Sequence, residues 1–249
     1  DFGDAMENIM ESLSISRQAR DSATMVEALL AMGFVYLFVE KYDDAIKVQQ
    51  EALQIYEQMK DSSGIARIYN DMGVTNMHAG KFEMALEQHK AALKIRLRTN
   101  EYYYTASSYA YLAHIYESLN MFPEAIHNYK AALDFTWLDG SRTNIILAYL
   151  DLGSVYMKNS EHDKAMEQFL TVLELSRAEN YPMAEVKAAT SIAKIYLEKG
   201  QPGEALVWLK RAEKNAPRPL PVFLKDLHLN IANTYSELGD YKNALLNLH

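Results

Sequence analysis

The sequence predicts an all-α solenoid of antiparallel helix pairs, because one pattern returns about every 40 residues. A small residue starts the pattern at Gly33, Gly73, Ala113, Gly153, Ala193 and Ala232. An alanine follows twelve residues after each of them, at Ala45, Ala85, Ala125, Ala165, Ala205 and Ala244. A fixed period in this range is typical of solenoids, in which each repeat buries its apolar face only against its neighbours.

Each repeat predicts two helices joined by a tight turn. In residues 26–57, apolar or small residues recur at the spacings that place them on one face of a helix. Glycine and asparagine tolerate the left-handed conformation that ends many helices, so we expect the chain to reverse seven residues after each small residue. Those positions are Glu40, Gly80, Asn120, Ser160, Gly200 and Gly239. The small residues have a different explanation, because two helices that cross closely leave no room for a larger side chain.

The repeats can be placed in order along the chain, which we expect to form one domain over residues 1–249. Residues 1–21 align with 41–61 and are therefore expected to be the second helix of an incomplete repeat. About five full pairs follow, at residues 22–61, 62–101, 102–141, 142–181 and 182–220, and an incomplete repeat at 221–249. Because solenoids need polar repeats at their ends, we expect an excised segment of a longer protein, with possible self-association through its ends.

The connections between repeats contain residues that can cap the following helix. These candidates are Asp21, Asp61, Asn100, Asp139 and Asn180, or residues near them. The connection at residues 215–221 differs, because it holds three of the six prolines. Proline restricts the backbone, so we expect an extended and stiff spacer there, with a hinge or a partner-binding motif as alternatives.

The pattern resembles the tetratricopeptide repeat. The match is carried by "MGFVY" with Ala45 and Ala52, "LAHIY" with Ala125, Tyr129 and Ala132, and "LGSVY" with Ala165 and Phe169. The period is longer than the usual 34 residues of that repeat, and it is similar to repeats of kinesin light chains, spindle-orientation adaptors, bacterial peptide-pheromone receptors and bacterial sensory regions. The resemblance implies a right-handed superhelical array whose first helices line a concave, ligand-binding groove.

Composition excludes several classes of function. A net charge of −8 and a pI near 5.4 disfavour nucleic acid, which needs a basic surface. No apolar run reaches the ~20 residues of a membrane span, and no signal segment opens the chain, so we expect no membrane partner. The absence of cysteine fits a reducing compartment, and we expect a cytoplasmic protein.

Motifs that carry catalysis are missing from the sequence. It holds no glycine-rich phosphate loop, no H-E-x-x-H and no nucleophile elbow. His114 and Glu117 could form half of a metal site, but no third ligand aligns with them, so we expect neither a metal nor a cofactor. The many tyrosines and methionines fall mostly at core positions, such as Met32, Tyr36, Tyr116 and Tyr156. The run Glu101–Thr105 is expected to begin a helix and to expose at least one ring.

The resemblance to tetratricopeptide repeats implies which residues face the groove. The candidate ligand-binding residues are Phe34, Leu37, Phe38, Arg67, Asn70, Met77, His78, His114, Lys158, Lys187, Thr190, Lys194 and Asn233. The cationic residues and Asn70 suit an extended acidic segment, or else they are merely solvated. The large apolar side chains from Phe34 to Phe38 need a cover, either a ligand helix or a helix upstream of the chain.

These observations predict a non-catalytic scaffold that binds a protein or peptide segment in extended or helical form, with an acidic segment among the candidates. The alternative is a ligand-sensing regulatory region of a larger bacterial signalling protein, such as a kinase, a nucleotide cyclase or a transcription factor. An enzyme is not expected, because no catalytic constellation is present.

Overall fold

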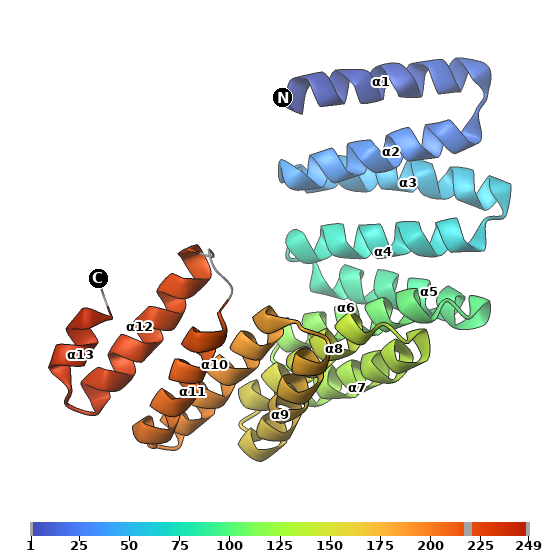
Figure 1. Cartoon of the computed structure of the whole chain (residues 1–249). Helices are drawn as coiled ribbons and strands as arrows, with labels where there is room; N and C mark the ends of the chain where they lie inside the picture. Colours follow the sequence, from blue (N-terminus) through green and yellow to red (C-terminus); the bar gives the residue numbers. More distant parts are fainter. Residues whose placement is uncertain (1, 217–220, 248–249) are drawn as a thin grey trace. The chain divides into compact units, whose positions relative to one another are not determined.

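The computed structural model describes residues 2–216 and 221–247, and in these ranges the chain forms thirteen α-helices and no strand (Figure 1). The helices are α1 (Phe2–Ala19), α2 (Ser22–Phe38), α3 (Tyr42–Met59), α4 (Ser62–His78), α5 (Phe82–Thr99), α6 (Tyr102–Ser118), α7 (Phe122–Asp139), α8 (Arg142–Lys158), α9 (His162–Ala178), α10 (Pro182–Glu198), α11 (Pro202–Asn215), α12 (Pro221–Glu237) and α13 (Tyr241–Leu246). The predicted all-α fold class of helix pairs is confirmed.

The helices form two compact units, Asp1–Asn120 and Met121–His249. The first unit contains α1 to α6 and the second contains α7 to α13. Within each unit, every helix packs against the next one along the chain, and successive helices run in opposite directions (Figure 1). One helix pair falls in each of the predicted full repeats, from α2 and α3 in residues 22–61 to α10 and α11 in residues 182–220.

The turn within each helix pair has the predicted left-handed conformation. The backbone angle φ is positive at all six expected positions, at Glu40, Gly80, Asn120, Ser160, Gly200 and Gly239. At Glu40 and Ser160 this angle is 60° and 59°, although a residue with a Cβ pays roughly 1–2 kcal/mol for it. The need to reverse the chain at a fixed point therefore outweighs the local preference of these two residues.

A second left-handed series closes α1, α3, α5, α7 and α9. It comprises Arg20, Lys60, Asn100, Gly140 and Asn180, which are also spaced by 40 residues. Asn100 and Asn180 were expected to cap the following helices, and this expectation is wrong because their backbones end the preceding helices instead. Asp139 lies inside α7, and the N-cap of α8 is Ser141.

Two of the residues named as caps are correct, and Ser141, near the named Asp139, caps α8 by accepting a hydrogen bond from the N–H of Asn144 at 3.5 Å. The carboxylate of Asp21 accepts hydrogen bonds from the backbone N–H groups of Ala23 and Thr24. Asp61 accepts one from the N–H of Gly64 at 3.0 Å. Glu101 and Tyr181 hold the N-cap positions of α6 and α10 without a side-chain hydrogen bond to the helix.

Close helix crossings explain the small residues of the pattern. A Cβ placed on Gly153 in α8 would lie 2.6 Å from Cε1 of Phe169 in α9. A Cβ on Gly73 in α4 would lie 2.6 Å from Nε2 of His89 in α5. The repeated alanines Ala45, Ala85, Ala125, Ala165 and Ala205 are fully buried. Helix pairs in both units are thus held at a distance that a larger side chain would prevent.

The aromatic and sulfur side chains are less uniformly internal than expected. Met32 and Tyr156 are buried, whereas Tyr36 and Tyr116 are half-buried.

The proline-rich connection begins after α11 at Ala216, whose backbone is extended. Residues 217–220, on which the expectation of a stiff spacer mainly falls, lie outside the described part of the chain.

The crossing of α8 and α9 can be tested with Gly153→Ala. We expect this change to lower the free energy of unfolding by about 1–3 kcal/mol, because the new methyl group overlaps the ring of Phe169. Gly203→Ala is the matched control in α11, where a Cβ meets nothing within 4 Å. Urea unfolding followed by circular dichroism measures both, and equal midpoints for the two variants would contradict the packing explanation.

Candidate functional site

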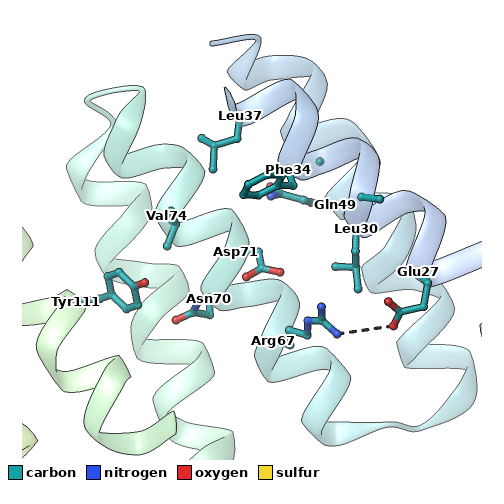
Figure 2. Close-up of a pocket in the computed structure, with 12 residues that line it drawn as sticks. Glu27, Leu30, Phe34, Leu37, Gln49, Arg67, Asn70, Asp71, Val74 and Tyr111 are labelled. Atoms are coloured by element: carbon teal, nitrogen blue, oxygen red, sulfur yellow. Dashed lines mark ion pairs between the residues drawn. The ribbon is translucent and has the colours of Figure 1, made fainter. Parts of the chain in front are cut away.

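A hollow with a cavity volume of about 540 Å³ lies in the first unit, and we call it the Phe34 hollow (Figure 2). Helices α2 and α4 form most of its walls, with Gln49 from α3 and Tyr111 from α6. Its lining residues are Glu27, Leu30, Ala31, Gly33, Phe34, Leu37, Gln49, Arg67, Asn70, Asp71, Val74 and Tyr111. The structure thus brings together four of the candidate residues, namely Phe34, Leu37, Arg67 and Asn70.

The α2 wall of the hollow is mostly apolar. The side chain of Phe34 is 69% exposed, and those of Leu30 and Leu37 beside it are half-buried. Figure 2 shows these three side chains pointing from α2 toward α4. Phe38 lies one turn further along α2 and is 65% exposed. A ring as exposed as Phe34, on the wall of a concavity, provides apolar surface that a bound segment could cover.

The α4 wall is mostly polar. The guanidinium Nη1 of Arg67 lies 3.7 Å from the carboxylate Oε1 of Glu27, so an ion pair connects α4 to α2 across the hollow (Figure 2). Asp71 is half-buried, and desolvation raises the pKa of its carboxyl group, while Arg67, Asn70 and Arg96 oppose that rise. Among the described residues, Asp71 has no ion pair within 4.0 Å.

A second hollow of about 640 Å³, which we call the Tyr104 hollow, lies beside the first. The two hollows share Arg67, Asn70, Asp71 and Tyr111, and we call them together the groove of the first unit. The expected exposure of the tyrosine run is confirmed, since Tyr102, Tyr103 and Tyr104 are 41%, 50% and 51% exposed. Tyr103 and Tyr104 line the second hollow and pack edge to face, with ring centroids 5.1 Å apart.

Arg96 lines the Tyr104 hollow and was not identified from the sequence. Although it is only 4% exposed, its Nη1 donates hydrogen bonds to Oδ1 of Asn70, the carbonyl oxygen of Tyr104 and Oγ of Ser108, at 3.5, 3.0 and 2.7 Å. Burial lowers the pKa of this guanidinium, and the nearby carboxylates of Glu101 and Asp71 oppose that effect. Arg96 therefore connects α5 to the groove side of α4 and to α6.

A signal for Arg96 was present in the repeat pattern. Position 96 corresponds to Tyr56, Thr136 and Ser176 in other repeats, and all of these are buried. A charge at a position that other repeats bury and leave uncharged predicts a specific set of hydrogen-bond partners.

His89 lies beneath the groove and supports one of its walls. It is fully buried and stacks on the groove residue Tyr111, with ring centroids 4.8 Å apart and an angle of 10° between the planes. Neither ring nitrogen has a hydrogen-bond partner in the described structure. Burial lowers the pKa of His89 to about 4, with a smaller effect of Arg96, so the imidazole is neutral at pH 7.

The other candidates of the first unit line neither hollow. Met77 and His78 lie in the last turn of α4, where Met77 is half-buried and His78 is exposed. His114 is exposed on α6. In the described residues, no group of three or more histidine, aspartate or glutamate side chains is arranged to hold a metal ion.

In the second unit, Lys158, Lys187, Lys194 and Asn233 are exposed on α8, α10 and α12. The ammonium of Lys194 lies 3.9 Å from the carboxylate of Glu198 on the same helix. Thr190 is half-buried, and its hydroxyl donates a hydrogen bond to the carbonyl oxygen of Val186 at 2.9 Å. Among the described helices, none has the length and apolar character needed to cross a bilayer.

Comparison with known families identifies the repeat. One model described as tetratricopeptide repeat matches residues 64–136, and a second with the same description matches residues 26–59, 146–179 and 226–247. Comparison with curated proteins gives no match.

Several solved structures are similar to the chain. BtubC from P. vanneervenii is 20% identical with a TM-score of 0.76, covering 88% of this chain and 95% of its own. A Signal Transduction ATPase with Numerous Domains protein from Pyrococcus horikoshii, which has a tetratricopeptide repeat sensor, is 17% identical with a TM-score of 0.80. That match covers 98% of this chain and only 38% of the other. A Rap protein complexed with competence and sporulation factor is 19% identical with a TM-score of 0.62, and the match covers 97% of this chain and 68% of the Rap protein. Identities this low show the fold alone.

The buried imidazole predicts a pH dependence of stability. In the unfolded chain His89 binds a proton below its ordinary pKa of 6.5, whereas in the folded protein it does so only below about 4. The free energy of unfolding should therefore fall as the pH drops from 6.5 towards 4, by up to about 3 kcal/mol from this group. His89→Phe should flatten that part of the profile, since Phe169 occupies the equivalent position against Gly153. Urea unfolding at a series of pH values measures this, and an unchanged slope would contradict it.

Proposed function

Because the chain belongs to the tetratricopeptide repeat family, we propose that it is a non-catalytic scaffold that binds a segment of another protein in the groove of the first unit. The observation that carries the proposal is the exposed ring of Phe34 on the wall of a concavity. The volume of the Phe34 hollow falls in the range of ~300–1,000 Å³ that is usual for ligand sites. Its apolar wall would supply affinity, and its few polar groups would orient the ligand.

The polar groups suit a peptide backbone. The side-chain amide of Asn70 offers both a donor and an acceptor beside the apolar wall, which is what an extended backbone requires. Arg96 donates to the amide oxygen of Asn70 at 3.5 Å, and this contact restricts the orientation of the amide before a ligand arrives. A polar group that is oriented in advance loses less entropy on binding. The similarity to a Rap protein solved with competence and sporulation factor supports a binding role for the fold.

We further propose that the exposed lysines Lys158, Lys187 and Lys194 on α8 and α10, which we call the lysine-bearing face of the second unit, accept an acidic segment. Lys158, Lys187 and Lys194 are exposed there, and ammonium groups pair readily with carboxylates. The expectation of an acidic partner therefore applies to the second unit. The cytoplasmic location of the protein remains a prediction.

A sensor region of a larger protein is the second candidate function. It is favoured by the similarity to the Pyrococcus horikoshii protein with a tetratricopeptide repeat sensor, of which the match covers 38%. In that case the same groove would bind the ligand, and the response would occur in another part of the protein. The two candidates therefore make the same prediction about Phe34.

Phe34→Ala tests the binding role of the groove. Peptides selected on the wild-type protein from a random display library should bind this variant at least about tenfold more weakly, because burial of a phenylalanine contributes ~1.5–3 kcal/mol. Val207→Ala, which removes an exposed apolar side chain from α11, is the control. Fluorescence anisotropy with labelled peptides measures the affinities. Equal binding by both variants would place the ligand elsewhere.

The acidic-segment proposal is tested by reversing three charges, in the triple variant Lys158→Glu, Lys187→Glu and Lys194→Glu. Binding of an acidic peptide library should be lost, while helicity and melting change little because exposed ion pairs contribute only ~0–1 kcal/mol each. Acidic peptides that bind the triple variant as well as the wild type would remove these lysines from the site.

A further inference from the structure

Asp71 occupies the point where the two hollows of the groove meet. It lines both hollows, and Figure 2 shows its side chain pointing into the Phe34 hollow. The carboxylate is half-buried and, among the described residues, has no cation within 4.0 Å. The nearby guanidinium of Arg67 is paired with Glu27 instead. A charge that has lost part of its hydration without gaining an ion pair would be stabilised by a cation supplied from outside.

The other charges of the groove point to the same kind of ligand. Four carboxylates line the two hollows, from Glu27, Asp61, Asp71 and Glu101, against two guanidiniums from Arg67 and Arg96. The formal charge of this lining is therefore −2. The ring of Tyr103 adds a π system on the side of the Tyr104 hollow, whereas the ring of Tyr104 already has the guanidinium of Arg96 over it, 5.2 Å from the centroid.

We propose that the groove of the first unit selects a protein segment in which a lysine or arginine side chain pairs with Asp71 while a neighbouring large apolar side chain packs on Phe34. This inference rests on the proposed function and adds the chemistry of its ligand. The charge of one ligand residue then decides which segments bind, because an acidic side chain in place of the lysine or arginine would be repelled by the carboxylates of Asp71 and Glu27. The first unit therefore prefers a basic segment, in contrast to the lysine-bearing face of the second unit.

Asp71→Asn separates the charge from the shape of the site. The amide has nearly the size of the carboxylate, and burial already favours the uncharged form of Asp71, so the variant should melt no lower than the wild type. Glu87→Gln, an exposed change on α5 outside both hollows, makes the same difference in net charge and is the matched control.

The experiment selects peptides of twelve residues from a random display library on three proteins: the wild type, Asp71→Asn and Glu87→Gln. We expect the wild type and Glu87→Gln to enrich peptides with lysine or arginine near a leucine, methionine or phenylalanine. Asp71→Asn should retain the apolar residue and lose the enrichment of the basic one. Synthetic peptides from the wild-type selection should bind Asp71→Asn at least about tenfold more weakly, the effect expected for a hydrogen-bonded charge.

A double-mutant cycle then tests direct pairing. The basic residue of a selected peptide is replaced by methionine, and both peptides are measured against the wild type and Asp71→Asn. Direct pairing predicts that Asp71→Asn weakens only the basic peptide, so the two changes are not additive. Additive effects of the two changes would overturn this inference but not the proposed function. The same holds if the selected peptides show no enrichment of lysine or arginine and yet lose affinity for Phe34→Ala. If no peptide binds the wild type, the proposed function itself fails.

Discussion

The close crossing of paired helices is the constraint on which both units depend. In three of the pairs, a glycine of the first helix faces a residue sixteen positions later in the second, namely Gly33 with Gln49, Gly73 with His89 and Gly153 with Phe169. Because the crossing leaves no room for even one additional methyl group at Gly73 or Gly153, it fixes the distance between α4 and α5 and between α8 and α9. Across the Phe34 hollow, the ion pair of Arg67 with Glu27 also connects α4 to α2.

Beneath the groove, the first unit has polar residues at core positions where the second unit has larger apolar or aromatic ones. The position sixteen residues after the small residue is tyrosine, phenylalanine or leucine in the second unit, at Tyr129, Phe169 and Leu209, but Gln49 and His89 in the first. Gln49 exchanges hydrogen bonds with the hydroxyl of Thr75, whereas His89 has no such partner and stacks on Tyr111. Because burial lowers the pKa of His89, this support of the groove responds to pH.

The sequence predicted the periodic features well, because a period averages over several repeats and tolerates exceptions such as Glu40 and Ser160. It also predicted that Phe34, Leu37, Arg67 and Asn70 belong to one surface, since their alignment with groove positions depends only on helix geometry. It missed Asp71 and Arg96 for a physical reason: their importance depends on contacts between neighbouring repeats, and Arg96 comes from a second helix, which the alignment excluded. The caps expected at Asn100 and Asn180 failed because asparagine suits both ends of a helix, and here the left-handed conformation was preferred.

The two series of left-handed residues divide the chain into pieces that can be exchanged. A junction at Gly140, between one helix pair and the next, keeps Gly153 in the same piece as Phe169, whereas a junction at Lys60 separates Gly64 from Tyr56, whose ring a Cβ on that glycine would overlap. A junction at Ser160 separates Gly153 from Phe169, so that this ring could meet an alanine selected for a different neighbour. Recombination between repeats, whether in evolution or in a designed chimera, therefore depends on which glycine and ring the junction separates, and Gly140 separates neither of these two pairs.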